Sequence, residues 1–230
     1  MKFVEIEQDT PEWLDYKRTR IGGSGAKLVA VPLTRAGFGG DYSPAGKWDL
    51  IAAKLSKPKE FNELPTDRGH RLEREAVEEL ETIVGKKFDA KPVIWVSDED
   101  DDLMLSSDGA EPGEKVTYDC EIKSFSYAGK HFKLLYTMLH YNGRGFDKLQ
   151  LDYKSDYRYQ ILHGFIVNPD LKVRYFVSYY PEALYAEHRM VIIPVFREEV
   201  EEEIAELKQY EIETLTSVRE IVSELVGDNF

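Results

Sequence analysis

The stretch from Ser106 to Lys123 constrains the fold most strongly, because two short apolar-flanked runs bracket a turn-rich connection there. The runs read LMLSS and TYDCEIKS, and the connection contains Gly109, Pro112 and Gly113. Glycine and proline between two such runs are typical of a turn that joins strands. The pattern therefore predicts a β-hairpin or a similar strand pair.

The second run alternates in polarity, and successive side chains of a strand face opposite sides. One face is then apolar and the other polar. The apolar face holds Tyr118, Cys120 and Ile122, and the polar face holds Asp119, Glu121 and Lys123. Asp108 lies just past the end of the first strand, where it can lean toward the polar face. Two acids and a lysine are thus expected to converge.

This grouping suits a divalent-metal site. Mg²⁺ prefers oxygen ligands, which Asp108 and Glu121 supply. Lys123 can orient or deprotonate a water, or steady a phosphate oxygen. The alternative interpretation is a surface hairpin with a solvated charged face, because the pattern is short. Other parts of the chain must decide between the two.

Composition favours one sizeable domain, since 42% of the 230 residues are hydrophobic. The single cysteine, Cys120, excludes a disulfide within the chain and any four-cysteine metal site. The first residues, MKFVEIEQDTPEW, lack the apolar core of a signal peptide. No stretch approaches the ~20 apolar residues of a membrane span. We expect a soluble intracellular protein without a membrane partner.

The formal net charge of −13 argues at first against a nucleic-acid partner. The charge is unevenly spread, because residues 197–230 hold 11 acids and 3 bases, a net of −8. Residues 1–196 therefore carry the remaining −5. An acidic terminal helix, expected at about 198–226, accounts for much of the total, and a locally basic cleft elsewhere remains allowed.

Residues 10–20 predict a short helix, with Thr10 as N-cap and Pro11 at the first helical position. The helix ends in the basic residues Lys17, Arg18 and Arg20. The sequence IGGSGAKLVAV follows, where three glycines around Ser24 permit a tight turn and Ser24 can cap the next helix. A helix start is an anion site. The lysine spacing excludes a Walker P-loop, and a purely structural turn is the alternative.

A helix from about Arg68 to Val84 carries an apolar stripe at helical spacing. Glu73 falls on the inward edge of this stripe, whereas Glu75, Glu78 and Glu79 fall on the outer face. A buried carboxylate needs a partner. Glu73 is therefore either a salt-bridged residue at the edge of the stripe or a third acid for the metal site.

The remaining pattern predicts strands and helices around one core, with no domain boundary in residues 1–230. Strands are expected at 92–97, 103–107, 174–180 and 190–196, and helices at about 43–55, 131–141, 155–167 and 198–226. The acidic run at 98–102 is interpreted as a solvated turn, and the five histidines have no metal-ligand spacing. Gln160 is a polar residue on a helix face that otherwise packs.

Five pieces in this order resemble the phage lambda-type exonucleases, also called YqaJ-like viral recombinases, of the PD-(D/E)XK nuclease superfamily. They are PEWLDYKRTRIGGSGA, RGHRLEREA, SSDG, CEIKS and YRYQILHGFIVNPDLKVRYFVSYYPE, and they span about residues 7–182. The family's G-x-x-x-E-x-x-A helix is matched by Gly69, Glu73 and Ala76. The sequence departs from the family at Ser107, where proline is frequent, and at Ser124-Phe125, where Cys-Pro is frequent. The segment from 123 to 160 is also longer than usual.

The resemblance implies an α/β (α+β) fold with a restriction-endonuclease-like core, in which helices flank a central mixed β-sheet. It also implies that Asp108, Glu121 and Glu73 hold Mg²⁺, or Mn²⁺ as a substitute, together with the Ile122 carbonyl. Lys123 corresponds to the family's catalytic lysine.

A pocket for the 5′-phosphate of a DNA end is the second implied site. Gln160 belongs to it as the glutamine that follows the core, and it also counts among the catalytic residues. The implied phosphate-binding residues are Lys17 or Arg18, Ser24, Ser106, Gln160 and Lys130.

The resemblance further implies 5′-to-3′ degradation of one strand of linear double-stranded DNA. The products are 5′ mononucleotides and a 3′ single-stranded tail, which a single-strand annealing protein would take over in phage-type recombination. A homotrimeric ring in the cytoplasm of a bacterial host is expected for such a phage or prophage protein. The alternatives are a structure- or sequence-specific endonuclease of the same superfamily and a non-catalytic DNA-end-binding module.

Overall fold

The computed structural model describes residues 1–7, 10–27, 50, 67–89, 94–125, 128–150 and 156–226. The helix predicted at 43–55 lies outside the described residues, apart from the buried Leu50. The described helices are α1 (Pro11–Arg18), α4 (Asp67–Val84), α5 (Ala128–Leu139), α6 (Arg158–Val167) and α7 (Glu201–Val226). Short 3₁₀ turns lie at η1 (Gly23–Gly25), η3 (Gly145–Lys148), η4 (Ala186–His188) and η5 (Arg197–Glu199). The other predicted helices are therefore confirmed, with ends shifted by a few residues.

The strands form two sheets. The first is antiparallel, in the order β1 (Lys2–Val4), β2 (Ile94–Val96) and β3 (Met104–Ser106). The second has the order β4 (Gly109–Ala110), β5 (Tyr118–Lys123), β6 (Val173–Tyr179) and β7 (Met190–Phe196). It is mixed, because β5 and β6 are parallel and the two outer pairs are antiparallel. The predicted strands are confirmed, and so is the mixed sheet flanked by helices.

The predicted hairpin is wrong in its pairing. The LMLSS run pairs with β2, and only the two residues of β4 pair with β5. Ser107 and Asp108 form a break between the sheets, where the Asp108 carboxylate accepts a hydrogen bond from the Ile122 N–H at 2.7 Å. Alternation within a run shows which side chains share a face, but it does not show which strand lies alongside.

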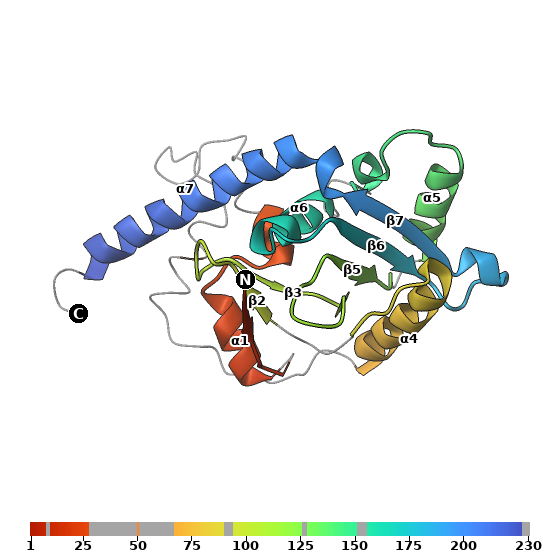
Figure 1. Cartoon of the computed structure of the whole chain (residues 1–230), viewed down its shortest axis with the longest axis horizontal. Coiled ribbons are helices and arrows are strands. Elements are labelled where there is room, and N and C mark those ends of the chain that lie inside the picture. The colour runs from red at the N-terminus through yellow and green to blue at the C-terminus, as the bar shows by residue number, and fades with distance from the viewer. Residues whose placement is uncertain are drawn as a thin grey trace.

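Helices cover both faces of β5 and β6 (Figure 1). On one face, Val77 and Leu80 of α4 share a core with Cys120 and Ile122 of β5. On the other face, Phe176 of β6 shares a core with residues of α6 and α7. In Figure 1, α7 runs along one side of the molecule and α4 lies on the opposite side of the strands.

The polar face of β5 is consequently buried beneath α6 and is not a solvated surface. Asp119 is fully buried, and Glu121 is only 2% exposed. The surface-hairpin interpretation is therefore wrong. A buried carboxylate must find a partner, because leaving it bare costs several kcal/mol.

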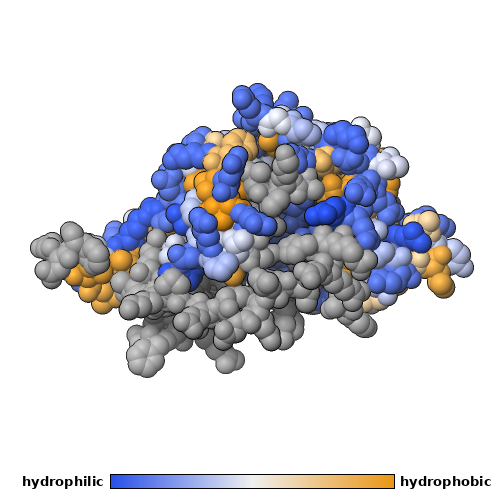
Figure 2. Space-filling model, turned by 90° about the horizontal axis from the view of Figure 1, so that it is seen from below, coloured by the Kyte–Doolittle hydropathy of each residue, from blue (hydrophilic) through white to orange (hydrophobic). Residues whose placement is uncertain are grey.

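The surface of the described residues is mostly hydrophilic when seen from below, with small separate apolar areas (Figure 2). None of the described helices is both long and apolar enough to cross a membrane.

Candidate active site

A pocket of about 210 Å³ collects side chains from five segments that are far apart in the sequence. Its walls come from α1 with the glycine turn at η1, from α4, from β3 with the β3–β4 break, from β5, and from α6. The lining residues are Trp13, Lys17, Gly22, Gly23, Ser24, Glu73, Met104, Leu105, Ser106, Asp108, Glu121, Lys123 and Gln160. Eight of the residues named from the sequence thus meet in one place.

The surroundings of Asp108 in this pocket disfavour the ionised form of its carboxyl group. Burial raises the pKa of the Asp108 carboxyl well above its usual range, and the charges of Glu121 and Glu73 raise it further. The Lys123 ammonium and the Ile122 N–H act in the opposite direction. A carboxylate in this setting is stabilised by an added cation.

Glu121 is held on one side only. Its Oε1 accepts a hydrogen bond from the Lys123 ammonium, whereas its Oε2 is buried without a hydrogen-bond partner among the described residues. An unsatisfied buried oxygen is rare in a folded protein and calls for a ligand or an ion. Glu121 lines the same pocket as Asp108.

Lys123 is only 25% exposed at its side chain. Burial alone would lower the pKa of Lys123, but Glu121 and Asp108 raise it above its ordinary value overall. Lys123 is therefore an ammonium ion at neutral pH.

Glu73 reaches the pocket from α4, and its charge acts on Asp108. Glu79 and Glu75, on the same helix, lie beside Tyr179 instead. Burial, followed by the hydrogen bond and charge of Glu79 and the charge of Glu75, raises the pKa of Tyr179 to about 12. The helical phase read from the sequence is confirmed for Glu73.

The donor set fits a hard divalent cation. Within the ranges that the structure describes, no three His, Cys, Asp or Glu side chains already stand at the spacing of a metal cluster. Nevertheless, three carboxylates line one pocket, and one buried oxygen, Glu121 Oε2, lacks a hydrogen-bond partner among the described residues. Carboxylate oxygens are the ligands that Mg²⁺ selects.

The other half of the pocket is built around the glycine turn. A Cβ on Gly23 would lie 3.1 Å from Leu105 Cδ1 and 3.2 Å from Gln160 Cγ, so β3 and α6 both close on this backbone. Ser24 lines the pocket together with Ser106 and Gln160, and it lies inside η1, whose own cap position is Gly22. The helix that Ser24 was expected to cap extends beyond the described residues, so its capping role stays a prediction.

Trp13 is a site residue that the sequence did not single out. Its ring lies 4.5 Å from the Lys17 ammonium, and its buried Nε1 has no hydrogen-bond partner among the described residues. A tryptophan four residues before a lysine shares a helix face with it. That spacing is the one signal that could have found Trp13.

Three residues named from the sequence do not line the pocket. Arg18 donates to Asp15 at 3.2 Å, one turn away on the same helix. Lys130 stands on α5. Ile122 is buried in the α4-side core and contributes its N–H to Asp108.

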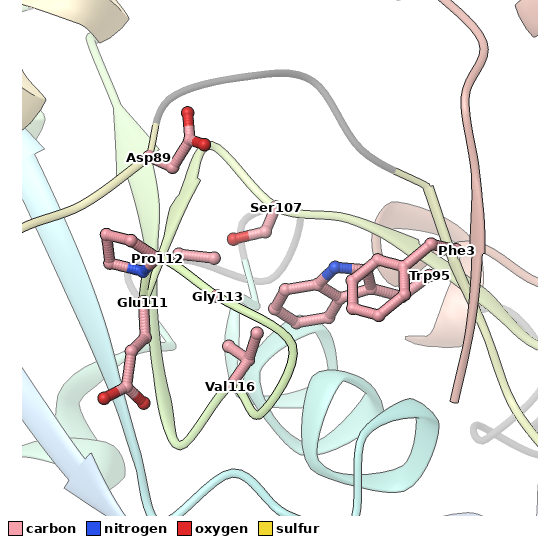
Figure 3. A pocket seen from close by; sticks show the side chains of 9 residues that line it. Phe3, Asp89, Trp95, Ser107, Glu111, Pro112, Gly113 and Val116 are labelled. Atoms are coloured by element: carbon pink, nitrogen blue, oxygen red, sulfur yellow. The ribbon is translucent and has the colours of Figure 1, made fainter.

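A second, smaller hollow lies beside the first sheet (Figure 3). Phe3, Trp95 and Pro112 line it together with Ser107, the immediate neighbour of a residue of the larger pocket. None of the acids around Lys123 reaches it. We therefore place the chemistry in the larger pocket.

Solved structures with the same architecture are exonucleases. LHK-Exo in complex with dAMP has a TM-score of 0.65 and 18% identity, over 94% of this chain and 98% of that one. The alkaline exonuclease LHK-Exo from Laribacter hongkongensis also gives a TM-score of 0.65, at 17% identity over the same shares. A phage-related exonuclease from Haemophilus somnus 129PT gives 0.58 at 14% identity, over 90% of this chain and 96% of that one.

No family model and no curated protein matches the sequence. The likeness therefore lies in the structure, where it extends over nearly the whole chain. The fold that the sequence resemblance implied is confirmed: this chain has the fold of the alkaline and phage-related exonucleases.

Proposed function

We propose that the protein is a metal-dependent exodeoxyribonuclease that degrades one strand of linear double-stranded DNA from its 5′ end. The observation that carries this proposal is the buried group of Asp108, Glu121 and Lys123, in which one Glu121 oxygen has no hydrogen-bond partner in the described part of the chain. The exonuclease fold of the structural neighbours supports the same reaction class.

In this proposal the acidic residues bind the metal ion, and Lys123 stabilises negative charge on the substrate. Asp108, Glu121 and Glu73 would be the ligands for Mg²⁺ or Mn²⁺, whereas the Ile122 carbonyl, which the resemblance adds, belongs to a residue outside the pocket lining. The bound ion would polarise the scissile phosphate and lower the pKa of a water molecule. Lys123 keeps its proton and stabilises the negative charge that develops on the phosphate oxygens.

The glycine-turn half of the pocket binds the terminal 5′-phosphate. Lys17 supplies a positive charge, and Ser24, Ser106 and Gln160 supply hydrogen bonds. Charge-assisted hydrogen bonds to phosphate are about twice as strong as neutral ones. Because the anchored phosphate and the acids share one small pocket, cleavage falls one nucleotide from the end. The product is then a 5′ mononucleotide, and the LHK-Exo complex with dAMP supports this proposal.

The wider setting is proposed from the resemblance. The protein acts as a homotrimeric ring on DNA in a bacterial host, and it leaves a 3′ tail for a single-strand annealing protein in phage-type recombination. Non-specific affinity for DNA comes from lysine and arginine neutralising phosphates, which a chain of net charge −13 does poorly. Enclosure of the duplex would retain the substrate without strong affinity.

One assay separates this function from the two alternatives. Linear and covalently closed circular duplexes are incubated with Mg²⁺, and nucleotide release is measured. We expect digestion of the linear form alone. Cleavage of both forms would indicate an endonuclease, and cleavage of neither would indicate a non-catalytic DNA-end-binding module.

The proposed preference for a 5′-phosphate is tested by the same measurement of nucleotide release. Linear duplexes with 5′-phosphate and 5′-hydroxyl ends are compared in the wild type and in Lys17→Ala. We expect faster release from the phosphorylated end, and loss of that difference in the variant. Equal rates for both ends in the wild type would rule out the phosphate pocket.

A further inference from the structure

Arg174 is a buried cation beneath the active-site pocket that the reaction described above does not use. It lies on β6 and is completely buried. Its Nε and Nη2 donate to the two oxygens of Asp119 at 2.8 and 2.7 Å, as a bidentate pair. Its remaining nitrogen, Nη1, donates to the carbonyls of Gln160 and Ile161 at 2.8 and 3.0 Å. One guanidinium therefore joins β5, β6 and the first turn of α6.

The fit between Arg174 and α6 is close. A Cβ built on Gly164 would lie 1.9 Å from Arg174 Nη1 and 2.1 Å from Cζ. Any larger residue at Gly164 would have to push the guanidinium aside. The helix can approach the sheet at this level only because Gly164 leaves room for Arg174.

The same network reaches the break that carries Asp108. Ser107 Oγ lies 3.2 Å from Asp119 Oδ2 and 3.0 Å from the Gly109 carbonyl. Ser107 is the residue immediately before Asp108. The contacts of Arg174 thus extend to both ends of the pocket, to Gln160 directly and to Asp108 through Asp119 and Ser107.

We propose that Arg174 is a positioning residue for this pocket. It sets the first turn of α6, which carries Gln160, against the strand that carries Glu121 and Lys123, and it steadies the break that carries Asp108. The inference rests on the proposed function, because it assigns the phosphate contact to Gln160. Arg174 touches no substrate and acts through the backbone of α6 and through Asp119.

Arginine suits this role because of its planar fork. A bidentate contact with Asp119 leaves Nη1 free to bind two carbonyls at the same time. A lysine can pair with Asp119 but cannot also span both carbonyls of α6. Removing either member of a buried ion pair is strongly destabilising, whereas an apolar pair of similar volume is often tolerated.

The chain contains a matched control in Arg197. Its guanidinium also binds carbonyls around α6, those of Phe165, Asn168 and Leu171, at 2.6 to 3.0 Å. These carbonyls lie at and beyond the C-terminal end of α6, away from the residues that line the pocket. Loss of Arg197 should therefore affect stability without affecting end recognition.

The test replaces both members of the pair in Asp119→Leu/Arg174→Met. Two readouts are taken: binding of 5′-phosphate and 5′-hydroxyl duplex ends in EDTA, and the rate of nucleotide release in Mg²⁺. We expect a variant that folds but has lost most of its preference for phosphorylated ends. Its release rate should fall on the order of 10- to 100-fold, the scale of a ~1 Å misplacement. Arg197→Met should keep the wild-type preference and rate.

A folded double variant with wild-type preference and rate would overturn the inference. If the double variant does not fold, Arg174→Lys decides in the same way: a reduced preference supports positioning, and an unchanged one overturns it. Failure of the proposed function has a different signature, since the wild type itself would then release no nucleotides from linear DNA. The binding readout does not depend on catalysis and separates the two cases.

Discussion

Glu73 and Glu75 stand two residues apart on α4 and have different surroundings. Glu73 lines the pocket and acts on Asp108, whereas Glu75 lies near Tyr179. We expect Glu73→Ala to reduce metal-dependent cleavage on the order of 10- to 100-fold, the range seen when support for a metal site is lost. Glu75→Ala should remain near the wild-type rate. Cleavage assays at several Mg²⁺ concentrations compare the two, and equal effects would contradict the assignment.

Trp13 offers a buried N–H that the described residues leave without an acceptor. A phosphate oxygen in the pocket would satisfy it. Trp13→Phe keeps an aromatic ring and removes the N–H together with part of the buried ring system. We expect affinity for 5′-phosphorylated ends to fall by about 10-fold or more, because a hydrogen bond to a charged group contributes about 1.5–3 kcal/mol.

Thermal unfolding provides the complementary measurement for Trp13→Phe. The melting temperature without DNA reports the packing of the ring: Trp13 packs with Ile94, Val96 and Met104, so the smaller ring should lower it, offset in part by removal of the unsatisfied N–H. An unchanged affinity together with a lower melting temperature would show that Trp13 serves packing only.

Single residues were predictable from the sequence where local periodicity sets their direction. The helical phase placed Glu73, and strand alternation placed Glu121 and Lys123 on one face. Arg174 was not predictable, because it lies within an apolar run, RYFVSYY, and its partner Asp119 is 55 positions away. Only the parallel pairing of β5 with β6 brings the two together.

At the scale of elements, a second buried ionic contact ties α6 to α7 and β3. His163 Nδ1 lies 2.7 Å from Glu211 Oε1, and His163 Nε2 lies 2.8 Å from the Met104 carbonyl. Both partners are acceptors, so both ring nitrogens must donate, which only the protonated imidazole can do. Burial alone would lower the pKa of His163, but Glu211 and the Met104 carbonyl raise it overall, against the opposing charge of Arg174.

This pair makes stability depend on pH in a defined direction. The pKa of His163 is higher in the folded state than in the unfolded state. Its contribution to the free energy of unfolding is therefore complete below the unfolded-state pKa of about 6.5, and it is lost as the pH rises through the folded-state pKa. His131 has the opposite effect on stability. Burial lowers its pKa, so protonation of His131 at low pH destabilises the folded state.

The contribution of His163 to stability is therefore measured as the difference in melting temperature between the wild type and a variant without the imidazole. Melting temperatures of the wild type and His163→Gln are recorded from pH 6 to 9. The advantage of the wild type should shrink as pH rises. A difference that stays constant over this range would show that His163 is neutral in the folded protein.

The acidic run at 98–102 shows an element whose surroundings the sequence did not reveal. It was interpreted as a solvated turn, but Arg219 of α7 donates to Asp100 and Asp102, and Lys208 of α7 donates to Glu99. These residues anchor the long C-terminal helix to the β2–β3 connection. The local sequence shows the charge of this run, but it does not show that the basic partners of these acids lie more than 100 positions away in the chain.

At the scale of the whole molecule, hydrophobic patterning indicated the individual strands and helices, and the family resemblance implied their arrangement as a mixed sheet flanked by helices. Neither indicated the division into two sheets. Runs of alternating residues specify strands, but the break at Ser107 and Asp108 depends on which strands lie alongside. The candidate active site includes Asp108 of this break, where the chain passes from one sheet to the other.

The proposed ring is a property of the assembled molecule. A chain of 26.6 kDa should assemble into a species of ~80 kDa with cyclic symmetry, in which each subunit uses two different patches. Native mass spectrometry and light scattering at micromolar concentration measure this directly. A clean monomer that still digests long duplexes processively would refute the ring.

The central claim is that the carboxylates beside Lys123 form a metal-dependent nuclease site. Its most direct test is the release of mononucleotides from linear 5′-phosphorylated duplex by the wild type and by Lys123→Ala, each in Mg²⁺ and in EDTA. We predict release by the wild type in Mg²⁺ alone, and a rate reduced by about 10²–10³-fold in Lys123→Ala with DNA binding retained, the scale of a lost group that stabilises developing charge. Undiminished release in EDTA, or in Lys123→Ala, would contradict the claim.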